Sequence, residues 1–267
     1  MIASIRIALA AAAFAVLSLC LIPFQYLFIR TGWPAQRRLP VFFHRIVCRL
    51  LGLRLHVHGK VARDRPLLLI ANHTSWLDIM VLSAVAEVSF IAKAEVRDWP
   101  LFGTFAVLQR SVFVERDKRG KTGEQASEIA KRLNEGDVMV LFAEGTTGDG
   151  NRVLPFKTSL FGAAQMAVRE SHMGSVTVQP VAVAYTHAHG LPLGRYHRPI
   201  ASWPGDVKLV PHLKGVLKEG AFDVEVRFGP PVSFAEGGDR KALARQMESE
   251  VRRLLGEALH GDRSAAA

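Results

Sequence analysis

Residues 67–78 read Leu67-Leu68-Leu69-Ile70-Ala71-Asn72-His73-Thr74-Ser75-Trp76-Leu77-Asp78. The five consecutive apolar residues 67–71 are typical of a strand buried in a parallel sheet. A helical run follows, which we predict over Trp76–Ala86. Strands that lead into helices are the repeating unit of α/β proteins, whose ligands bind where the strands end. His73 and Asp78 are therefore candidates for a functional site.

The same alternation of short apolar runs and longer periodic runs continues along the chain. We predict strands at Leu53–His58, Leu67–Ala71, Val88–Lys93, Ser111–Glu115, Val138–Ala143, Val176–Val183 and Asp223–Phe228. We predict helices at Trp76–Ala86, Trp99–Leu108, Thr122–Asn134, Ser159–Ser171 and Asp239–Leu259, with a capping box at Thr122 and Gln125 and an N-cap at Asp239. The predicted fold class is α/β, with a largely parallel central sheet flanked by helices. The segment from Tyr185 to Gly220 has no clean period and is expected to be a long surface excursion.

The N-terminal segment is long and apolar enough to cross a membrane. No charged residue lies between Arg6 and Arg30, and a spanning helix needs roughly 20 apolar residues. We predict an N-terminal membrane helix or anchor over residues 1–30, a basic juxtamembrane segment over 31–50, a catalytic domain over 51–260 and a disordered tail over 261–267. A cleaved signal peptide is the alternative, and Pro23 leaves open a hairpin that dips into one leaflet.

Charge and cysteine content limit the possible partners. The chain has 267 residues, with 34 Lys and Arg against 24 Asp and Glu, a net charge of +10. This excess predicts an acidic partner such as anionic membrane lipids. Arginines after the apolar segment favour a catalytic domain that faces the cytoplasm, at a bacterial-type inner membrane. The two cysteines form no disulfide framework, and we predict no bound metal or cofactor. His187, His189, His197 and His212 lack accompanying carboxylates and are expected to be solvated or membrane-facing loop residues.

His73 and Asp78 have the chemistry of a general base and its orienting partner. A carboxylate that accepts the Nδ1 proton leaves Nε2 free to remove a proton. No Gly-x-Ser-x-Gly elbow and no suitably placed cysteine is present, so the base would activate a hydroxyl of the substrate. The alternative is a histidine that caps the helix while Asp78 is solvated.

Two further segments follow predicted strands. Phe113-Val114-Glu115-Arg116 ends in a guanidinium suited to an anionic group, although an exposed arginine paired with a neighbouring carboxylate is the simpler reading. The segment 142–151, Phe142-Ala143-Glu144-Gly145-Thr146-Thr147-Gly148-Asp149-Gly150-Asn151, has three glycines whose backbone N–H groups are able to face an anion. An ordinary glycine-rich turn is the alternative. Arg152 and Lys157 add positive charge, and the absence of Gly-Lys-Ser/Thr excludes a P-loop.

Across residues 50–235 these blocks together resemble the phospholipid/glycerol acyltransferase family, the lysophosphatidic-acid acyltransferase superfamily. The His-x-x-x-x-Asp block falls on His73 and Asp78, and the Phe-x-x-Arg block falls on Phe113 and Arg116. The Glu-Gly-Thr block falls on Glu144, Gly145 and Thr146. A fourth block, a strand that ends in a proline-containing turn, fits Val178-Gln179-Pro180-Val181.

The resemblance implies a glycerolipid acyltransferase-like fold and transfer of an acyl chain to a lysolipid hydroxyl. The donor would be an acyl carrier protein thioester or a coenzyme A thioester. His73 would be the general base and Asp78 its orienting partner. Arg116, Glu144 and Gly145 would bind the acceptor head group, together with the adjacent Thr146 and Thr147.

The sequence departs from the family pattern in the third block. The usual Phe-Pro-Glu-Gly-Thr-Arg has Ala143 in place of proline and Thr147 in place of arginine. The stretch 144–157 is similar to the branch that includes lyso-ornithine lipid acyltransferases. Asp149 would then face the ornithine ammonium, and an ordinary residue of an Asp-Gly turn is the alternative. Arg152 and Lys157 are able to replace the missing guanidinium, so lysophosphatidic acid is the alternative acceptor.

Two other classes of protein compete with an acyltransferase. One is a lipid hydrolase that uses the same residue pair on water. The other is a non-catalytic basic protein that binds membranes or nucleic acid, which leaves the ordered blocks unexplained. We predict no nucleic-acid partner.

Overall fold

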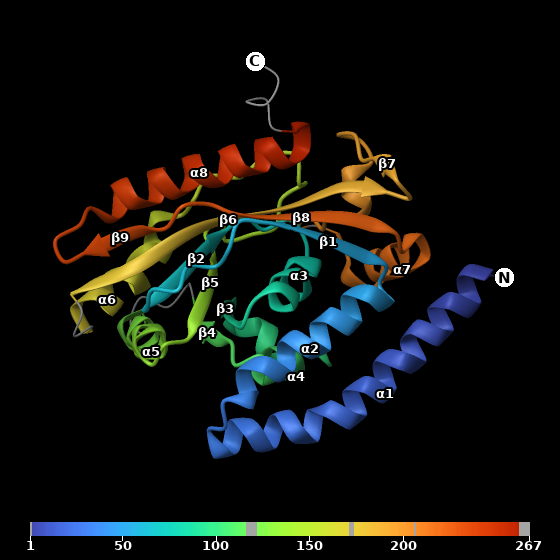
Figure 1. The fold of residues 1–267 in the computed structure, drawn as a ribbon, viewed down its shortest axis with the longest axis horizontal. Coiled ribbons are helices and arrows are strands. Elements are labelled where there is room, and N and C mark those ends of the chain that lie inside the picture. Colours follow the sequence, from blue (N-terminus) through green and yellow to red (C-terminus); the bar gives the residue numbers. More distant parts are fainter. Residues whose placement is uncertain (1, 116–121, 171–173, 206, 262–267) are drawn as a thin grey trace.

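The computed structural model describes residues 2–115, 122–170, 174–205 and 207–261 (Figure 1). Its centre is a nine-stranded sheet in the order β1-β8-β6-β2-β5-β3-β4, with β7 and β9 also paired to β6. The strands are β1 Leu53–His58, β2 Leu67–Ala71, β3 Val88–Lys93, β4 Val112–Val114, β5 Val138–Phe142, β6 Ser175–Ala188, β7 Leu191–Pro192, β8 Phe222–Phe228 and β9 Val232–Ala235. The predicted α/β class with a largely parallel sheet is confirmed. β6, β2, β5, β3 and β4 run parallel, and β8 is antiparallel to β6.

Helices cover both faces of the sheet (Figure 1). The α-helices are α1 Ile2–Thr31, α2 Ala35–Leu50, α3 Leu77–Val85, α4 Phe102–Leu108, α5 Thr122–Asn134, α6 Gly162–Glu170, α7 Leu209–Glu219 and α8 Arg240–His260. Short 3-10 helices occupy η1 Ala94–Asp98, η3 Thr158–Phe161 and η4 Arg198–Ile200. Side chains of α5, α6 and α8 pack in the core on one face. Those of α2, α3 and α7 pack on the other, with Phe14 of α1 against them.

Most predicted elements are confirmed. The strands β1, β2 and β3 have the predicted bounds, as does α5, and the side chain of Asp239 accepts a hydrogen bond from the N–H of Lys241 at the start of α8, 2.8 Å away. The proposed capping box of Thr122 and Gln125 lies outside the described side chains. So does the tail beyond residue 261.

The expectation that Tyr185 to Gly220 is irregular was wrong at both ends. β6 continues through Tyr185 to Ala188, and α7 occupies Leu209–Glu219. The strand also runs straight through Pro180, where the fourth block predicted a turn. Pro180 lies where the partner on one side of β6 changes from β9 to β8. A residue without an N–H is tolerated at such an interruption of the ladder.

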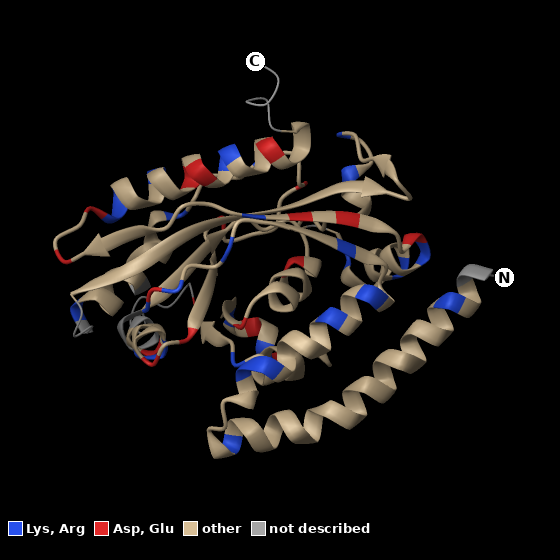
Figure 2. Ribbon diagram, in the orientation of Figure 1, with Lys and Arg blue, Asp and Glu red and all other residues tan. Residues whose placement is uncertain are grey.

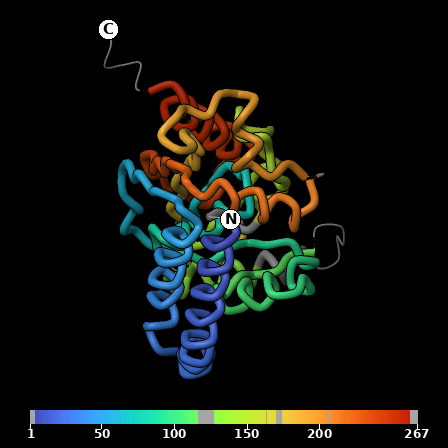
Figure 3. Tube along the Cα trace, turned by 90° about the vertical axis from the view of Figure 1, so that its right-hand side faces the viewer, coloured from blue at the N-terminus to red at the C-terminus, as the bar shows by residue number. Residues whose placement is uncertain are grey.

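The N-terminal helices form an antiparallel pair beside the sheet domain (Figure 3). Residues 4–31 of α1 have the length and hydropathy of a membrane-spanning helix, and 11% of their most apolar 18-residue stretch is buried against the rest of the protein. Charged residues appear only near its two ends (Figure 2). No helix was predicted for the residues of α2. It carries several arginines and packs against α3.

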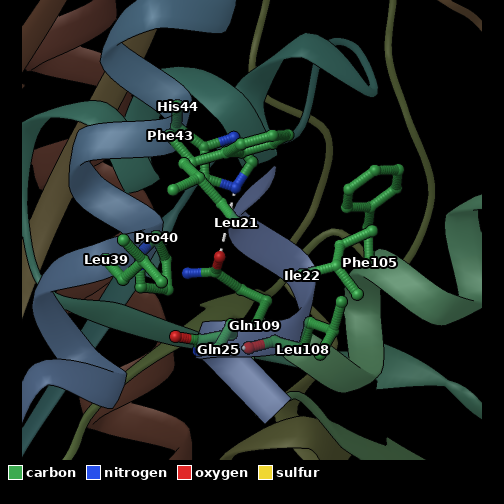
Figure 4. Close-up of a pocket in the computed structure, with 10 residues that line it drawn as sticks. All are labelled: Leu21, Ile22, Gln25, Leu39, Pro40, Phe43, His44, Phe105, Leu108 and Gln109. Carbon is green, nitrogen blue, oxygen red and sulfur yellow. Dashed lines mark hydrogen bonds between the residues drawn. The ribbon is translucent and has the colours of Figure 1, made fainter. Parts of the chain in front are cut away.

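Gln25 of α1, Pro40 of α2 and Leu108 of α4 line a small pocket between these three helices (Figure 4). Pro40 has no N–H, so the carbonyl of Gln36 in the preceding turn lacks its helical donor. The Nε2 of Gln25 donates to this carbonyl at 3.0 Å and to the carbonyl of Leu108 in α4 at 2.8 Å. Gln25 therefore compensates for the proline and fastens α1 to two neighbours at once.

Gln25→Met should destabilise the protein although it keeps the size and apolar body of the side chain. The bond to Leu108 is buried and the bond to Gln36 is partly buried. A buried carbonyl that loses its donor costs about 1–3 kcal/mol, so we expect a loss of about 2 kcal/mol. Denaturant unfolding in detergent measures this loss. Gln36→Met is the matched control, because only the backbone of Gln36 takes part, and equal stabilities of the two variants would contradict the role of Gln25.

Candidate active site

His73 lies just beyond the carboxyl end of β2, in the turn that leads to α3. Its ring stacks on that of Phe142, the last residue of β5, with 3.9 Å between the ring centroids. β2 and β5 run parallel with Ala71 opposite Phe142. This register brings the residues after both strands to the same edge of the sheet, as ligand sites of α/β proteins require.

Asp78 is fully buried and receives four hydrogen bonds. Its Oδ2 accepts from the Nδ1 of His73 at 2.9 Å and from the N–H groups of Thr74 and Ser75 at 2.6 and 2.9 Å. Its Oδ1 accepts from the hydroxyl of Tyr185 at 2.8 Å. Nδ1 of His73 is thereby the protonated nitrogen, and Nε2 is left as the basic one. The alternative of a solvated Asp78 is wrong.

Glu144 is also buried, and both of its carboxylate oxygens face backbone donors. Oε1 accepts from the N–H of His73 at 2.9 Å, and Oε2 accepts from the N–H of Leu154 at 3.1 Å. Burial raises the pKa of Glu144 to about 8, although these two hydrogen bonds oppose the shift. Glu144 ties the loop after β5 to the turn that carries His73.

The loop 144–151 continues over this turn. Gly148 donates its N–H to the carbonyl of His73 at 2.8 Å. Gly150 adopts a φ of +76°, and a Cβ there would lie 2.9 Å from the Cγ2 of Thr74 and 3.1 Å from the Cδ of Arg198. Only glycine suits that position, because the left-handed φ and the lack of space both exclude a side chain.

The other predicted binding residues differ in how exposed they are. Thr147 and Asp149 are partly buried in the loop, whereas Thr146, Arg152 and Lys157 are exposed. Gly145 is buried and has a φ of +73°. Asp149 accepts hydrogen bonds from the N–H and the side-chain Nδ2 of Asn151. Burial alone would raise the pKa of Asp149, but these bonds and the charges of Arg152 and Arg195 outweigh burial, so the pKa lies below its ordinary value. Arg116 lies outside the described residues.

Two of the four histidines were predicted wrongly as loop residues. His187 is a half-buried residue of β6. His212 belongs to α7, is buried, and accepts a hydrogen bond from the Nε1 of Trp76 at 3.0 Å. Its ring therefore packs α7 against the beginning of α3, next to the turn that carries His73. Leu209, Leu213 and Val216 keep helical spacing in α7, and Pro211 lies in its first turn, where proline is tolerated, so the sequence did carry a signal for this helix.

Two residues of the site were not assigned roles from the sequence. Asn72 is buried and joins β2 to β6, because its amide exchanges two hydrogen bonds with the backbone of Val183, at 2.9 and 3.0 Å. Tyr185 reaches Asp78 from β6, across 107 residues of sequence. Neither link has a local signal, since each depends on the pairing of β2 with β6.

Comparisons with known proteins agree with this geometry. Residues 54–184 match the model of the family described as Acyltransferase. The Lyso-ornithine lipid O-acyltransferase of Brucella abortus is 66% identical over 98% of this chain and 98% of its own, and that of Rhizobium meliloti is 53% identical over 100% and 91%. The crystal structure of the 1-acyl-sn-glycerophosphate acyltransferase of Thermotoga maritima has the same fold, with a TM-score of 0.65 at 23% identity over 96% of this chain and 97% of that one.

A buried carboxylate that orients a histidine at the end of a parallel strand, in a chain with this family match, defines an acyltransferase. The chain belongs to the acyltransferase family. Within it, the chain is similar over nearly its whole length to enzymes named for lyso-ornithine lipid.

Glu144→Gln should remove one component of the pH dependence of stability. The pKa of Glu144 rises from its ordinary 4.5 to about 8 in the folded protein. The folded state therefore binds this proton more tightly, and stability falls as pH rises from about 4.5 to about 8, by at most about 1.4 kcal/mol per pH unit. Glutamine cannot ionise, so the variant should lose less stability over that range.

Thermal unfolding in detergent between pH 5 and pH 9 measures the difference. Glu236→Gln, at an exposed position of a turn, is the matched control and should follow the wild type. A wild-type and Glu144→Gln pair whose melting temperatures differ by a constant amount at every pH would show that Glu144 does not titrate there.

Proposed function

We propose that this protein transfers a fatty acyl chain from an acyl thioester to the hydroxyl group of lyso-ornithine lipid. The observation that carries the proposal is the hydrogen bond between Nδ1 of His73 and buried Asp78, which leaves Nε2 as a base at the edge of the sheet. The names of the two relatives with 66% and 53% identity support the acceptor.

In the proposed reaction, Nε2 of His73 removes the proton of the acceptor hydroxyl as its oxygen attacks the thioester carbonyl. Asp78 stabilises the positive charge on the imidazole. Collapse of the tetrahedral intermediate breaks the carbon–sulfur bond, and His73 returns the proton to the leaving thiolate. The loop 144–151 lies beside His73. The N–H groups of Gly145 and Gly148 already donate to the carbonyls of Phe142 and His73, so other backbone N–H groups of the loop would stabilise the developing oxyanion. The chain needs no acyl-enzyme intermediate for this sequence.

The acceptor head group would bind in the loop after β5. A lyso-ornithine lipid carries an ammonium and a carboxylate, and this loop offers Asp149 to the first and Arg152 or Lys157 to the second. Glu144 holds the loop in place through the N–H groups of His73 and Leu154, and Gly145 and Thr146 would lie against the head group. Thr147 stands where the family has an arginine, which removes a phosphate ligand without adding a charge. Arg116 completes the proposed set.

The acyl donor would be an acyl carrier protein thioester or a coenzyme A thioester, both of which are acidic. The positive net charge of the chain favours their approach and that of anionic lipids. The excess of arginines just after α1 supports a catalytic domain that faces the cytoplasm at the inner membrane.

We propose that α1 attaches the protein to one leaflet. Near its beginning, Arg6 donates to the carbonyls of Lys218 at 2.7 Å and Gly220 at 3.1 Å, at the end of α7. Near its other end, Gln25 donates to Leu108 of α4. A helix that is bonded to the domain at both ends lies along the domain. Its outward face carries exposed apolar side chains such as Leu9, Val16 and Leu19.

His73→Ala should abolish acyl transfer while folding and membrane attachment persist, because the variant removes the base and leaves α1 intact. We expect a loss on the order of 10²–10⁴-fold. The measurement follows a radiolabelled acyl chain from a thioester into lyso-ornithine lipid. Label that appears instead as free fatty acid in the wild type would identify a hydrolase, and full transfer by a folded variant would assign the base elsewhere.

Thr147→Arg should shift acceptor preference toward lysophosphatidic acid, because arginine offers a bidentate phosphate contact. A charge-assisted hydrogen bond contributes roughly 1.5–3 kcal/mol, so the ratio of the two rates should move by about tenfold or more. Transfer to lyso-ornithine lipid and to lysophosphatidic acid is measured side by side. Thr147→Leu is the control for bulk, since it should lower both rates without favouring either acceptor. A wild type that already prefers lysophosphatidic acid, with a ratio unchanged by arginine, would contradict the acceptor assignment.

A further inference from the structure

Tyr185 is a buried phenol that the proposed reaction does not use. It lies on β6 with none of its surface exposed, and its ring belongs to the core beneath α2 and α3. The hydroxyl nevertheless points at a charged group, because it donates to the Oδ1 of Asp78 at 2.8 Å. Burial and the negative charge of Asp78 raise the pKa of Tyr185 well above its ordinary value. The phenol therefore stays protonated and acts as a donor.

The hydrogen-bond donors of the two Asp78 oxygens come from different parts of the fold. Oδ2 receives its three donors from the local turn, from His73, Thr74 and Ser75. Oδ1 accepts a hydrogen bond from the Tyr185 hydroxyl on β6, and no other described side chain donates to it. A buried carboxylate oxygen without a donor is costly, so the carboxylate would turn or attract a proton if this hydroxyl were absent.

We propose that Tyr185 is a positioning residue for acyl transfer, which fixes Oδ1 of Asp78 so that Oδ2 remains on Nδ1 of His73. The proposal rests on the function assigned above to His73. The phenol also draws part of the carboxylate charge toward Oδ1, away from the imidazole. Tyr185 thereby influences the orientation of the His73 ring and how strongly Asp78 stabilises the protonated imidazole.

Other titratable groups near this network are Glu144 and Cys48. Glu144 binds the backbone N–H of His73 and has a pKa of about 8. Cys48 of α2 lies near Tyr185, and burial raises the pKa of its thiol to about 12, so the thiol is neutral at the pH of the assay. Glu144 is therefore the group whose titration must be separated from an effect of Tyr185.

Tyr185→Phe is the test, because it removes the hydroxyl and keeps the ring in the core. We expect kcat to fall about tenfold while KM for both substrates stays within about twofold, since a hydrogen bond to a charged group is lost and no substrate contact changes. Without the phenol, more of the negative charge of Asp78 faces the imidazole of His73. The acidic limb of the pH profile of kcat/KM should move up by about half a pH unit.

The profile is measured in the wild-type and Glu144→Gln backgrounds, and the shift should appear in both. Tyr26→Phe, at an exposed position of α1, is the matched control and should change neither kcat nor the profile. The proton NMR signal of the His73 Nδ1–H, identified by its loss in His73→Ala, should shift in Tyr185→Phe.

A purely structural role for Tyr185 would lower the melting temperature and leave the pH profile and the Nδ1–H signal unchanged, which would overturn the proposal. An increase of KM with unchanged kcat would also overturn it. The two proposals fail separately. If a folded His73→Ala variant retains acyl transfer, the proposed role of His73 is wrong and the base lies elsewhere, whereas loss of transfer in His73→Ala with wild-type behaviour of Tyr185→Phe refutes only the role of Tyr185.

Discussion

A carboxylate that has no contact with water must be matched by donors, and Asp78 sets this requirement for the whole site. Two of its donors are the N–H groups of the turn after β2, so the turn has one conformation in which all of them converge. A third is the histidine, and the fourth is a phenol on β6. The sheet must therefore place β6 beside β2, and Asn72 reinforces this pairing with two hydrogen bonds of its own. The orientation of one imidazole depends on the assembly of the centre of the sheet.

Local chemistry made most of the fold predictable. β2 and β5 are continuous apolar runs because both of their faces are buried, and α5 has a clear helical period. The failures have physical causes. α2 reads as a basic segment because its arginines are as prominent as its apolar face, and Pro40 interrupts it. β6 contains Pro180, which normally ends a central strand, and its position at a change of partner cannot be read from the sequence.

The same division between local and distant contacts applies to the site. His73 and Asp78 are five residues apart, and the turn between them was enough to predict that they meet. The motif also selected Glu144, but its environment emerged only from the fold, where both oxygens accept backbone N–H groups and burial raises its pKa to about 8. Tyr185 was assigned to an irregular segment, since its link to Asp78 requires the register of β6 against β2. A motif therefore predicts the residues proposed for the reaction more readily than the residues that hold them.

The two hydrogen-bonded ends of α1 have a mechanical consequence. Arg6 bonds the beginning of the helix to α7, and Gln25 bonds its final third to α4. The helix is therefore fixed against the domain and is not a flexible tether. A tethered domain would sample a range of heights above the lipid surface, whereas a mounted one keeps a fixed height and tilt. With α1 in one leaflet, the enzyme would search for its acceptor by lateral diffusion in two dimensions. Its rate would then depend on the surface density of lysolipid, and changes in bilayer thickness would be transmitted through α1 to the distance between His73 and the lipid hydroxyl.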